Sequence, residues 1–456
     1  MFKKSFRPRD ASKPGNATRS ISSPGTTDSK RNRSEPVTLE IEKLAQGGAG
    51  LGRHGGRTVF VPFTAPGERI TAHLYRRKAD YDEGVLETII TPSPVRRTPP
   101  CPLFGVCGGC QLQHLTEAAQ AQYKTDALAE ALVRIGKIPN ANVLPVVTSP
   151  ESLGYRRRAR LTVKNGRLGF LRRQSHEVVP VSHCPLLTPV LNETLAAVEK
   201  DLPLAGLEEI ELQGGDGVLV VLRGTAFAPR VARAFFEAYR PLCRGVVLYT
   251  LEGRRCFGLD HLVYPYPERT MRVSDRTFVQ VNGPVNQLMI EHLLRRVSAT
   301  DTVLELHSGM GNFTLLLARR ATVVTAVERN PMAVEDARRN LRGLSNVTLI
   351  CAPVAQAMKR MLPKAFTRVV LDPPREGAVA ILPHLLRLQP TAISYLSCNP
   401  ATFARDAGLL CRNGYRLQTV QPFDLMPQTG QIEVLAELVR ETSPTPVMPE
   451  APSAVL

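Results

Sequence analysis

Hydrophobic and polar residues alternate differently in three parts of the chain. Between residues 37 and 90, the short β-type runs VTLEIEKL, TVFVPF, ERITAHLY and GVLETII are separated by polar and glycine-rich clusters. Short strands at this spacing predict a small closed β-barrel. We expect the glycine-rich segment 47–56 to form tight turns, because it lacks the spacing of a phosphate-binding loop.

The middle of the chain mixes helical and strand periodicity. It follows a proline-rich linker, TPSPVRRTPPCP, at residues 91–102. The run EAAQAQYKTDALAEALVRIG has the spacing of a helix, whereas ARLTV, RLGFLRR, IELQ and VLVVLR have the content of strands. This part therefore predicts an α+β domain.

After about residue 298, short apolar runs alternate with helical segments. The predicted strands are TVLEL (302–306), TVVTAV (322–327), NVTLI (346–350), RVVL (368–371), AISYLS (392–397), YRLQTV (415–420) and EVLAELV (433–439). Such alternation predicts a doubly wound sheet with helices on both faces. The last run has no helix before it, so we expect it to join the sheet in antiparallel orientation.

The fold class is therefore multidomain, with an N-terminal small β-barrel of TRAM or OB-like type, a central α+β domain and a C-terminal α/β Rossmann-like domain. The predicted bounds are 36–95, 96–290 and 291–441. The segments 1–35 and 442–456 are predicted to be disordered tails, because they contain few apolar residues. An organellar transit peptide remains an alternative for the Arg- and Ser-rich N-terminus, although it shows no amphipathic helical period.

Charge points to a polyanionic partner. The chain has 58 Lys and Arg against 41 Asp and Glu, a formal net charge of +17. Residues 1–34 contribute +7 of this, which leaves +10 for the rest. The stretch from Tyr155 to His176 holds eight basic residues, no acid, and the aromatic residues Tyr155 and Phe170. Basic groups that neutralise phosphates, beside rings that stack on bases, favour RNA over a merely solvated surface. No apolar run reaches the roughly 18 residues of a membrane span.

A pair of glycines after strand TVLEL marks a candidate nucleotide site. Gly309 and Gly311 allow a tight turn, and a helix expected to begin near Asn312 presents free N–H groups. The next strand leads to Glu328, 19 residues after Gly309, where a carboxylate can hold two ribose hydroxyls.

NAD and S-adenosylmethionine both fit this arrangement. The GxGxxG fingerprint fails, because its third glycine position is Thr314. The segment DPPREG, which begins at Asp372, resembles the substrate-side loop of class I methyltransferases. The pattern therefore favours S-adenosylmethionine over other nucleotides.

Cys398 follows the strand AISYLS, at the edge of the sheet where ligands bind in open α/β folds. An isolated cysteine at a strand end is more often a small buried apolar residue. Here Asn399 and Pro400 end the strand at once, and the next helix directs its positive end toward the sulfur. This setting lowers the pKa of a thiol, so we expect Cys398 to be a nucleophile. Glu433 is the candidate general base.

These segments together resemble the bacterial uridine-5 RNA methyltransferase family, and most of all its 23S rRNA members with a TRAM domain and an iron–sulfur cluster. The resemblance spans about residues 36–440 and rests on CPLFGVCGGC, GYRRRARL, HCPLL, FVQVN, GMGNF, DPPREG, SCNP and QIEV. It implies S-adenosylmethionine-dependent methylation of carbon 5 of a uridine in RNA. It also implies that Cys398 adds covalently to carbon 6 and that Glu433 is the base.

The resemblance also implies a cofactor site formed by Gln280, His307, Gly309, Gly311, Asn312, Glu328 and Asp372. Three positions depart from the pattern of the family. His307 replaces an aromatic residue, Pro353 stands where a polar cofactor contact is expected, and Gln431 replaces a histidine two positions before the base. These departures bear on cofactor contacts and proton transfer, and they leave the nucleophile and the base in place.

Nine cysteines without an export signal predict metal binding or catalysis rather than disulfides. Four thiolates spaced as C-x5-C-x2-C with a distant fourth suit zinc and an iron–sulfur cluster alike. The resemblance assigns a [4Fe–4S] cluster to Cys101, Cys107, Cys110 and Cys184. Spacing leaves the other cysteines without partners, and we expect Cys243, Cys256, Cys351 and Cys411 to lie in the core.

Other functions share part of this pattern. A radical S-adenosylmethionine enzyme needs Cys-x3-Cys-x2-Cys, and an amino methyltransferase has no use for Cys398. A non-catalytic RNA-binding iron–sulfur protein would not need Cys398, Asp372 and Glu433 together. A tRNA uridine-5 methyltransferase is the alternative to the 23S rRNA enzyme. We expect a cytoplasmic monomer that binds RNA and no membrane.

Overall fold

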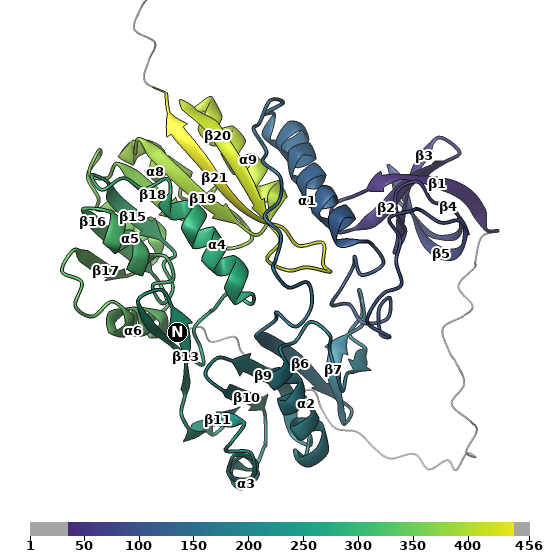
Figure 1. Ribbon diagram of the computed structural model, residues 1–456, viewed down its shortest axis with the longest axis horizontal. Coiled ribbons are helices and arrows are strands. Elements are labelled where there is room, and N and C mark those ends of the chain that lie inside the picture. Colours follow the sequence, from purple (N-terminus) through teal and green to yellow (C-terminus); the bar gives the residue numbers. More distant parts are fainter. Residues whose placement is uncertain (1–34, 442–456) are drawn as a thin grey trace, which may run out of the picture.

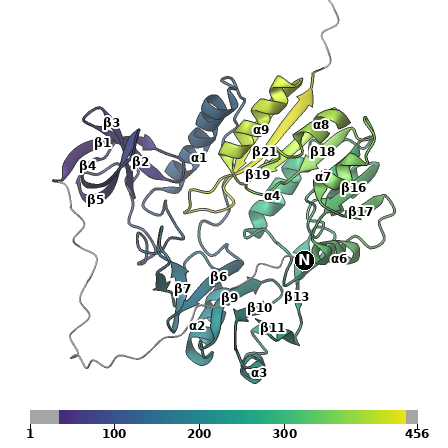
Figure 2. The same cartoon turned by 180° about the vertical axis from the view of Figure 1, so that it is seen from behind.

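The structure is a computed structural model that describes residues 35–441. The tails predicted at 1–35 and 442–456 lie outside the described residues, except for Glu35. In Figure 1 the chain forms a barrel on one side, a central sheet below, and a C-terminal sheet with its helices on the other side. The same arrangement is seen from behind in Figure 2.

The N-terminal part is a closed five-stranded barrel, as predicted. Its strands follow the order β1-β2-β3-β5-β4, with β3 and β5 parallel and the other pairs antiparallel. Alternate side chains of the strands fill its small core. The strands are β1 (Val37–Leu44), β2 (Ala49–His54), β3 (Arg57–Pro62), β4 (Arg69–Arg77) and β5 (Tyr81–Thr91).

The glycine-rich segment 47–56 differs from the expectation of turns alone, because most of it forms strand β2. Gly50 and Gly52 lie inside this strand. A Cβ on Gly50 would lie 2.0 Å from the Thr64 hydroxyl oxygen, and one on Gly52 would lie 2.4 Å from the Glu40 carbonyl oxygen. The two glycines therefore allow close packing of the barrel rather than a change of direction.

The helical run predicted at 117–136 is confirmed as helix α1 (Glu117–Ala131) with a π-helical turn η1 (Leu132–Gly136). Thr116 caps α1 by accepting a hydrogen bond from the Ala119 amide. The turn η1 packs on helix α9 (Pro400–Arg412) of the C-terminal sheet, where a Cβ on Gly408 would lie 2.3 Å from the Gly136 carbonyl oxygen. In both views α1 lies beside α9 (Figures 1 and 2).

The central part contains a seven-stranded mixed sheet with the order β12-β11-β10-β9-β6-β7-β8. Helices α2 (Pro189–Asp201) and α3 (Pro229–Ala238) pack against it. The hairpin of β13 (His261–Tyr266) and β14 (Arg269–Ser274) then leads to helix α4 (Gly283–Leu294). The strands of the sheet are β6 (Arg158–Lys164), β7 (Arg167–Leu171), β8 (Val178–Pro180), β9 (Leu207–Gly214), β10 (Val218–Gly224), β11 (Cys243–Thr250) and β12 (Gly253–Gly258).

The C-terminal sheet has seven strands in the order β17-β16-β15-β18-β19-β21-β20. Strand β21 is antiparallel to both of its neighbours, as predicted for the last run. All seven predicted strands are present, at β15 (Thr302–Leu306), β16 (Val323–Glu328), β17 (Val347–Cys351), β18 (Arg368–Leu371), β19 (Ala392–Ser397), β20 (Tyr415–Phe423) and β21 (Glu433–Arg440).

Helices cover both faces of this sheet, which confirms the doubly wound prediction. One core joins the sheet to α1, α7 (Val354–Lys359), α8 (Leu382–Leu388) and α9. The other joins it to α4, α5 (Thr314–Arg320), α6 (Pro331–Asn340) and the β13–β14 hairpin. Helix α5 begins at Thr314, two residues after the expected start. Among the described helices, none is long and apolar enough to cross a bilayer.

Candidate active site

Three of the predicted site residues meet at one edge of the C-terminal sheet. Strands β18 and β19 are parallel neighbours, so their carboxyl ends bring Asp372 and Cys398 to the same edge. Strand β21 runs the opposite way and pairs Val434 with Ser397, which places Glu433 beside Cys398. The charges of Asp372 and Glu433 both act on the thiol.

The local structure around Cys398 is as expected, but its electrostatic setting is not. Asn399 caps helix α9 by accepting a hydrogen bond from the Ala401 amide at 3.1 Å. We expected this setting to lower the pKa of the thiol, and this expectation is wrong, because the pKa is raised. Burial raises the pKa of Cys398, and the charges of Glu433 and Asp372 raise it further.

The two carboxyl groups beside the thiol also favour their neutral forms. Burial raises the pKa of Asp372 to about 6. Glu433 is only 5% exposed, and burial together with the charge of Asp372 holds its pKa well above the ordinary value. A raised pKa makes a carboxylate a stronger base, which suits the abstraction of a proton from carbon.

Arg375 is a member of this cluster that sequence reasoning left unassigned. Its carbonyl oxygen accepts hydrogen bonds from Asn399 Nδ2 and Thr402 Oγ1, each at 3.1 Å. Its guanidinium donates to Gln431 Oε1 at 2.9 Å. The charge of Arg375 and its hydrogen bond to the sulfur lower the pKa of Cys398, against the effect of burial. The available signal was that Arg375 is the only cation in DPPREG.

The glycine loop after β15 has the tight geometry that the sequence predicts. His307, Gly309 and Gly311 have φ values of 65°, 58° and 93°. The Gly309 amide donates to Glu328 Oε2 at 3.1 Å, and the other oxygen accepts from the amides of Arg329 and Asn330 at 2.8 Å each. A carboxylate has about four acceptor positions. Glu328 therefore keeps capacity for about one ribose hydroxyl, where we expected two.

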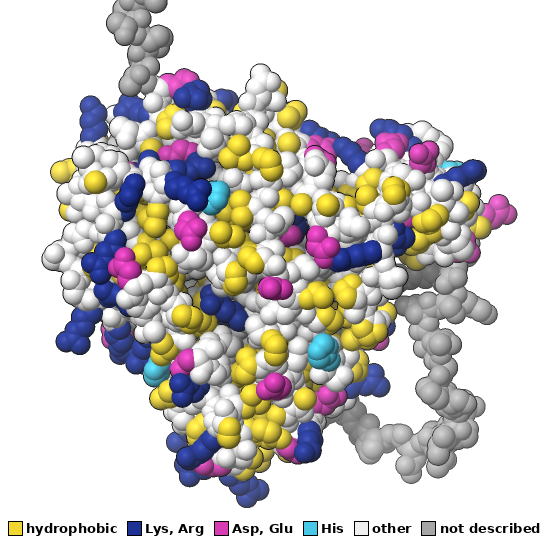
Figure 3. Space-filling view, viewed as in Figure 1, with side chains coloured by type: hydrophobic (Ala, Val, Ile, Leu, Met, Phe, Trp, Pro, Cys, Tyr) yellow, Lys and Arg dark blue, Asp and Glu magenta, His cyan; other side chains and the backbone are white. Residues whose placement is uncertain are grey.

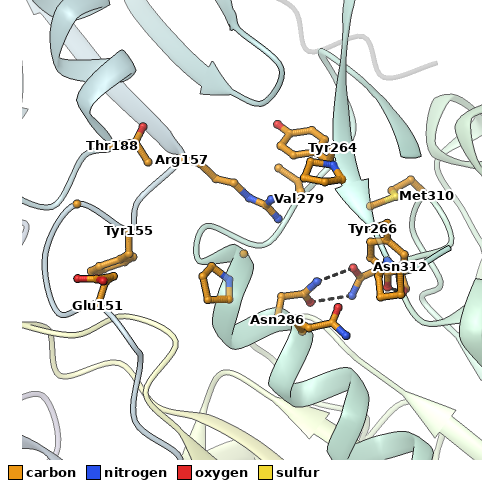
Figure 4. Close-up of a pocket in the computed structure, with 16 residues that line it drawn as sticks. Glu151, Tyr155, Arg157, Thr188, Tyr264, Tyr266, Val279, Asn286, Met310 and Asn312 are labelled. Carbon is orange, nitrogen blue, oxygen red and sulfur yellow. Dashed lines mark hydrogen bonds between the residues drawn. The ribbon is translucent and has the colours of Figure 1, made fainter. Parts of the chain in front are cut away.

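Asn312, in the glycine loop, contacts the central part of the chain, and the backbone of Gln280 is held by Arg157 of that part. The amides of Asn312 and Asn286 form a reciprocal pair with two hydrogen bonds of 3.0 Å, and the Tyr266 hydroxyl donates to the Asn312 carbonyl. Arg157 donates from Nε to the Gln280 carbonyl at 2.8 Å. Figure 4 shows the cavity of about 660 Å³ at this junction, with the amide pair on its wall. Asn286 was not predicted.

Glu305 is a second residue that sequence reasoning missed. It is 1% exposed, and neither carboxyl oxygen has a hydrogen-bond partner. Burial, with the charges of Asp372 and Glu328, raises its pKa to about 8. The Ser308 hydroxyl in the glycine loop is also buried without a partner. Such orphaned polar groups fit a bound polar ligand or ordered water. The signal was an acid inside the apolar run TVLEL.

The four predicted ligand cysteines line one small cavity. Cys101, Cys107, Cys110 and Cys184 surround a space of about 160 Å³. The Gly109 amide donates to the Cys107 sulfur at 3.4 Å, and burial raises the pKa of Cys110 to about 12. Within residues 35–441, no three Cys, His, Asp or Glu side chains are arranged as ligands of a metal ion.

Other cysteine expectations are partly wrong. All nine cysteines are free. Cys243 is buried and Cys256 and Cys411 are half-buried, but Cys351 is exposed at the end of strand β17. Cys351 is the last residue of the edge strand of the sheet, where the helices that cover the sheet do not bury it.

In the basic stretch 155–176 the two aromatic residues are largely internal, whereas four of the eight basic residues are exposed: Arg160, Lys164, Arg167 and Arg172. Tyr155 is 5% exposed and its hydroxyl donates to the Pro427 carbonyl, so little of its ring is open for stacking on a base. Arg158 is paired with buried Glu211 at 2.5 Å. Phe170 packs against the core of the central sheet. In Figure 3, Lys and Arg are spread over the visible face rather than gathered in one block.

This architecture defines the class of the protein. A seven-stranded sheet with one inserted antiparallel strand, a glycine loop after β15 and an acidic residue at the end of β16 form a class I methyltransferase domain. An N-terminal barrel precedes it. The comparisons with known proteins identify the family.

Residues 265–440 match the family model described as tRNA (Uracil-5-)-methyltransferase, and residues 30–86 match the TRAM domain. A relative from Klebsiella pneumoniae (strain 342), named 23S rRNA (uracil(1939)-C(5))-methyltransferase RlmD, is 37% identical over 417 residues. That alignment covers 87% of this chain and 94% of the relative. An uncharacterized RNA methyltransferase from Aquifex aeolicus is 33% identical over 89% of this chain and 99% of its own length.

A solved structure shares the fold. The tRNA (uracil-54, C5)-methyltransferase of Pyrococcus abyssi, in complex with S-adenosyl-L-homocysteine, has a TM-score of 0.72. It is 24% identical, and the match covers 88% of this chain and 99% of that chain. The chain belongs to the TRAM-containing family of RNA (uracil-5-)-methyltransferases, enzymes that use S-adenosylmethionine.

Proposed function

We propose that this enzyme methylates carbon 5 of a uridine in 23S rRNA through covalent catalysis by Cys398. The observation that carries the proposal is the meeting of Cys398, Glu433 and Asp372 at one sheet edge, next to the glycine loop. Relatives named for 23S rRNA that align over nearly their whole length support the choice of RNA.

The chemistry explains why a thiolate is needed. Carbon 5 of uracil is a weak nucleophile toward a methyl sulfonium. When the Cys398 thiolate adds to carbon 6, the electron pair of the 5,6 double bond moves into an enolate, and carbon 5 becomes nucleophilic. S-adenosylmethionine supplies the methyl group. Arg375 stabilises the thiolate before attack, because its guanidinium lies against the sulfur.

Glu433 completes the reaction. After methyl transfer, carbon 5 carries both a methyl group and a proton. Glu433 accepts that proton, the 5,6 double bond forms again, and the bond between sulfur and carbon 6 breaks with its electron pair returning to sulfur. No net oxidation or reduction occurs.

Two variants test the covalent mechanism. Cys398→Ala should lose methylation but keep binding of S-adenosylmethionine, because the thiol attacks the base. Glu433→Gln should accumulate a methylated enzyme–RNA adduct on denaturing gels, because elimination stalls. RNA containing 5-fluorouridine should trap the wild-type enzyme as an adduct and leave Cys398→Ala unattached. Turnover by Cys398→Ala would exclude the mechanism.

The target is tested in the cell. Ribosomal RNA from a strain that lacks the gene should lose one 5-methyluridine in 23S rRNA, as seen by mass mapping. If the methyl group is lost from transfer RNA instead, the substrate is a tRNA and the proposal of 23S rRNA is wrong.

For the cofactor, we propose contacts from Gln280, His307, Gly309, Gly311, Asn312, Glu328 and Asp372. The orphaned carboxyl of Glu305 and the free acceptor capacity of Glu328 support a polar ligand at this loop. Calorimetric titration of Glu328→Ala should show weakened binding of S-adenosylmethionine.

We also propose that residues 36–95, 96–290 and 291–441 form separate folding units, and that the protein is a cytoplasmic monomer that acts on RNA.

We further propose that Cys101, Cys107, Cys110 and Cys184 hold a [4Fe–4S] cluster of structural role. Around one zinc ion, with Zn–S bonds of about 2.3 Å, the sulfurs would lie about 3.8 Å apart. A cluster carries its ligands on separate irons and so requires wider spacing. Four cysteines that line one cavity support a site with four sulfur ligands, and the family resemblance favours a cluster in that site over zinc.

The amide donation to Cys107 suits a cluster as well, since N–H groups directed at sulfur stabilise the reduced charge. Protein purified without oxygen should be brown and contain about four iron atoms per chain. Cys107→Ser should lose the colour and weaken RNA binding more than cofactor binding. A colourless protein with stoichiometric zinc would exclude the cluster and leave the role of Cys398 unaffected.

A further inference from the structure

The loop between β20 and β21, residues 424–432, leads directly into Glu433 and is buried over most of its length. A buried loop needs partners for its backbone polar groups, because water does not reach them. The partners of this loop come from segments about 300 residues earlier in the chain.

Gln428 is the residue of the loop with the most partners. It is completely buried and has a φ of 69°. Its carbonyl accepts from the amides of Gln111 and Leu112 at 3.1 and 3.0 Å. Its amide donates to Gln120 Oε1 at 2.9 Å. Its side-chain oxygen accepts from Arg97 at 2.9 Å and from Gln120 Nε2 at 3.0 Å.

The backbone conformation of Gln428 separates the role of the side chain from that of the main chain. A positive φ costs a non-glycine residue free energy, and glycine adopts it freely. If only the course of the loop mattered, glycine would suit this position better. We therefore infer that the side chain has a role of its own, which is to hold the loop against Arg97 and Gln120.

Gln111 connects the loop to the cysteine-rich segment. Its side chain donates from Nε2 to the Gly108 carbonyl at 2.9 Å and accepts from the Gly430 amide at 3.2 Å. Gly108 lies between Cys107 and Cys110. The cysteine segment and the loop that carries the proposed base are thus joined by one side chain.

The loop is also linked to the reactive cluster. Thr429 Oγ1 accepts from the Gln431 amide at 3.3 Å, and Gln431 Oε1 accepts from Arg375. Arg375 in turn lies against Cys398. A shift at Gln428 would therefore change the placement of both Glu433 and the partner of Arg375.

We propose that Gln428 is a positioning residue for proton removal, which holds the loop so that Glu433 faces the substrate, and that Gln111 ties this position to the cysteine segment. The inference rests on the proposed roles of Cys398 and Glu433. It adds a residue that touches neither the RNA base nor the cofactor.

The test variant is Gln428→Gly, which removes the side chain and keeps every backbone bond of the residue at a φ that glycine adopts. We expect kcat to fall by about 10- to 100-fold, because small misplacement of a reacting group has that effect. The KM for S-adenosylmethionine should stay within about twofold. Because elimination is the slowed step, a covalent adduct with natural RNA should accumulate.

The matched control is Gln389→Gly. Gln389 also has a positive φ, of 55°, but it ends helix α8. This control should leave kcat and the adduct level unchanged. If Gln428→Gly lowers activity only in proportion to the loss of sites that bind S-adenosylmethionine, with no added adduct, the residue is merely structural and the proposal is overturned.

Gln111→Ala tests the connection to the cysteine segment. It should lower kcat in the same direction, and the double variant with Gln428→Gly should lose less than the product of the single effects. Independent, multiplicative effects would overturn the connection. Glu433→Gln is measured in parallel. If Glu433→Gln forms an adduct and Gln428→Gly does not, the positioning role of Gln428 is overturned and the proposed base stands. If Glu433→Gln forms no adduct, the proposed role of Glu433 as the base is overturned.

Discussion

The thiol of Cys398 lies in an environment that opposes its own ionisation. It is half-buried, and two carboxyl groups, those of Glu433 and Asp372, act on it from neighbouring strands. Arg375 is the cation that compensates. The balance between these charges therefore controls how much thiolate is present at neutral pH, before any RNA binds.

This balance is measurable by alkylation of Cys398 with iodoacetamide, followed peptide by peptide in a mass spectrometer. Arg375→Gln should raise the pKa of the thiol and slow alkylation at neutral pH by about three- to tenfold. Asp372→Asn removes a negative neighbour, so it should lower the pKa and speed alkylation. Exposed Cys351 serves as the internal reference. Equal rates in all three proteins would contradict the electrostatic account.

The raised pKa of Glu305 predicts that the stability of the fold depends on pH. Its pKa is raised to about 8, so the folded protein holds a proton that the unfolded chain releases at lower pH. The stability from this group is complete below the ordinary pKa near 4.5 and is lost as pH rises through about 8. Glu305→Gln stays neutral, so its Tm relative to that of the wild type should rise between about pH 4.5 and about pH 8 and stay level above that interval.

The measurement compares the two Tm values without S-adenosylmethionine, with exposed Glu199→Gln as the control. A difference that does not change with pH would show that Glu305 keeps its ordinary pKa in the fold.

At the scale of elements, strand β2 shows how packing can use glycine within a strand. Gly52→Ala would place a Cβ 2.4 Å from the Glu40 carbonyl and 2.6 Å from the Leu39 side chain. Overpacking of this kind costs about 1–3 kcal/mol. We expect faster hydrogen exchange in β1 to β3, measured by mass spectrometry on the full chain. His54→Ala, at the exposed end of the same strand, should not change exchange.

At the scale of the whole molecule, positive charge is divided between the described residues and the N-terminal segment. Removal of residues 1–34 lowers the formal charge from +17 to +10. Because RNA binding releases counterions in proportion to the phosphates neutralised, the truncated protein should show a shallower dependence of Kd on salt. Its kcat should stay within about twofold. An unchanged salt dependence, measured by fluorescence anisotropy, would show that the segment does not contact RNA.

Much of the fold was predictable because local pattern determines secondary structure. The runs 302–306, 368–371 and 392–397 became β15, β18 and β19 with unchanged bounds. Each is an apolar run ended by a residue that breaks strands or turns the chain. Strand β2 was missed because its glycines resemble turn residues in the sequence. They are required because any side chain there would clash with Thr64 and Glu40, which come from elsewhere in the barrel.

By itself, the sequence determined the order of the strands along the chain and the placement of Asp372, Cys398 and Glu433 at strand ends. Only the tertiary structure decided their environment. The pKa of Cys398 is raised first by burial and then by carboxyl groups 26 and 35 residues away, and the partners of the Gln428 side-chain oxygen lie more than 300 residues away. The hydrophobic period and the spacing of motif residues are set by a few neighbouring residues in the sequence. The burial of a side chain and the charges around it depend on residues that come together only when the chain has folded.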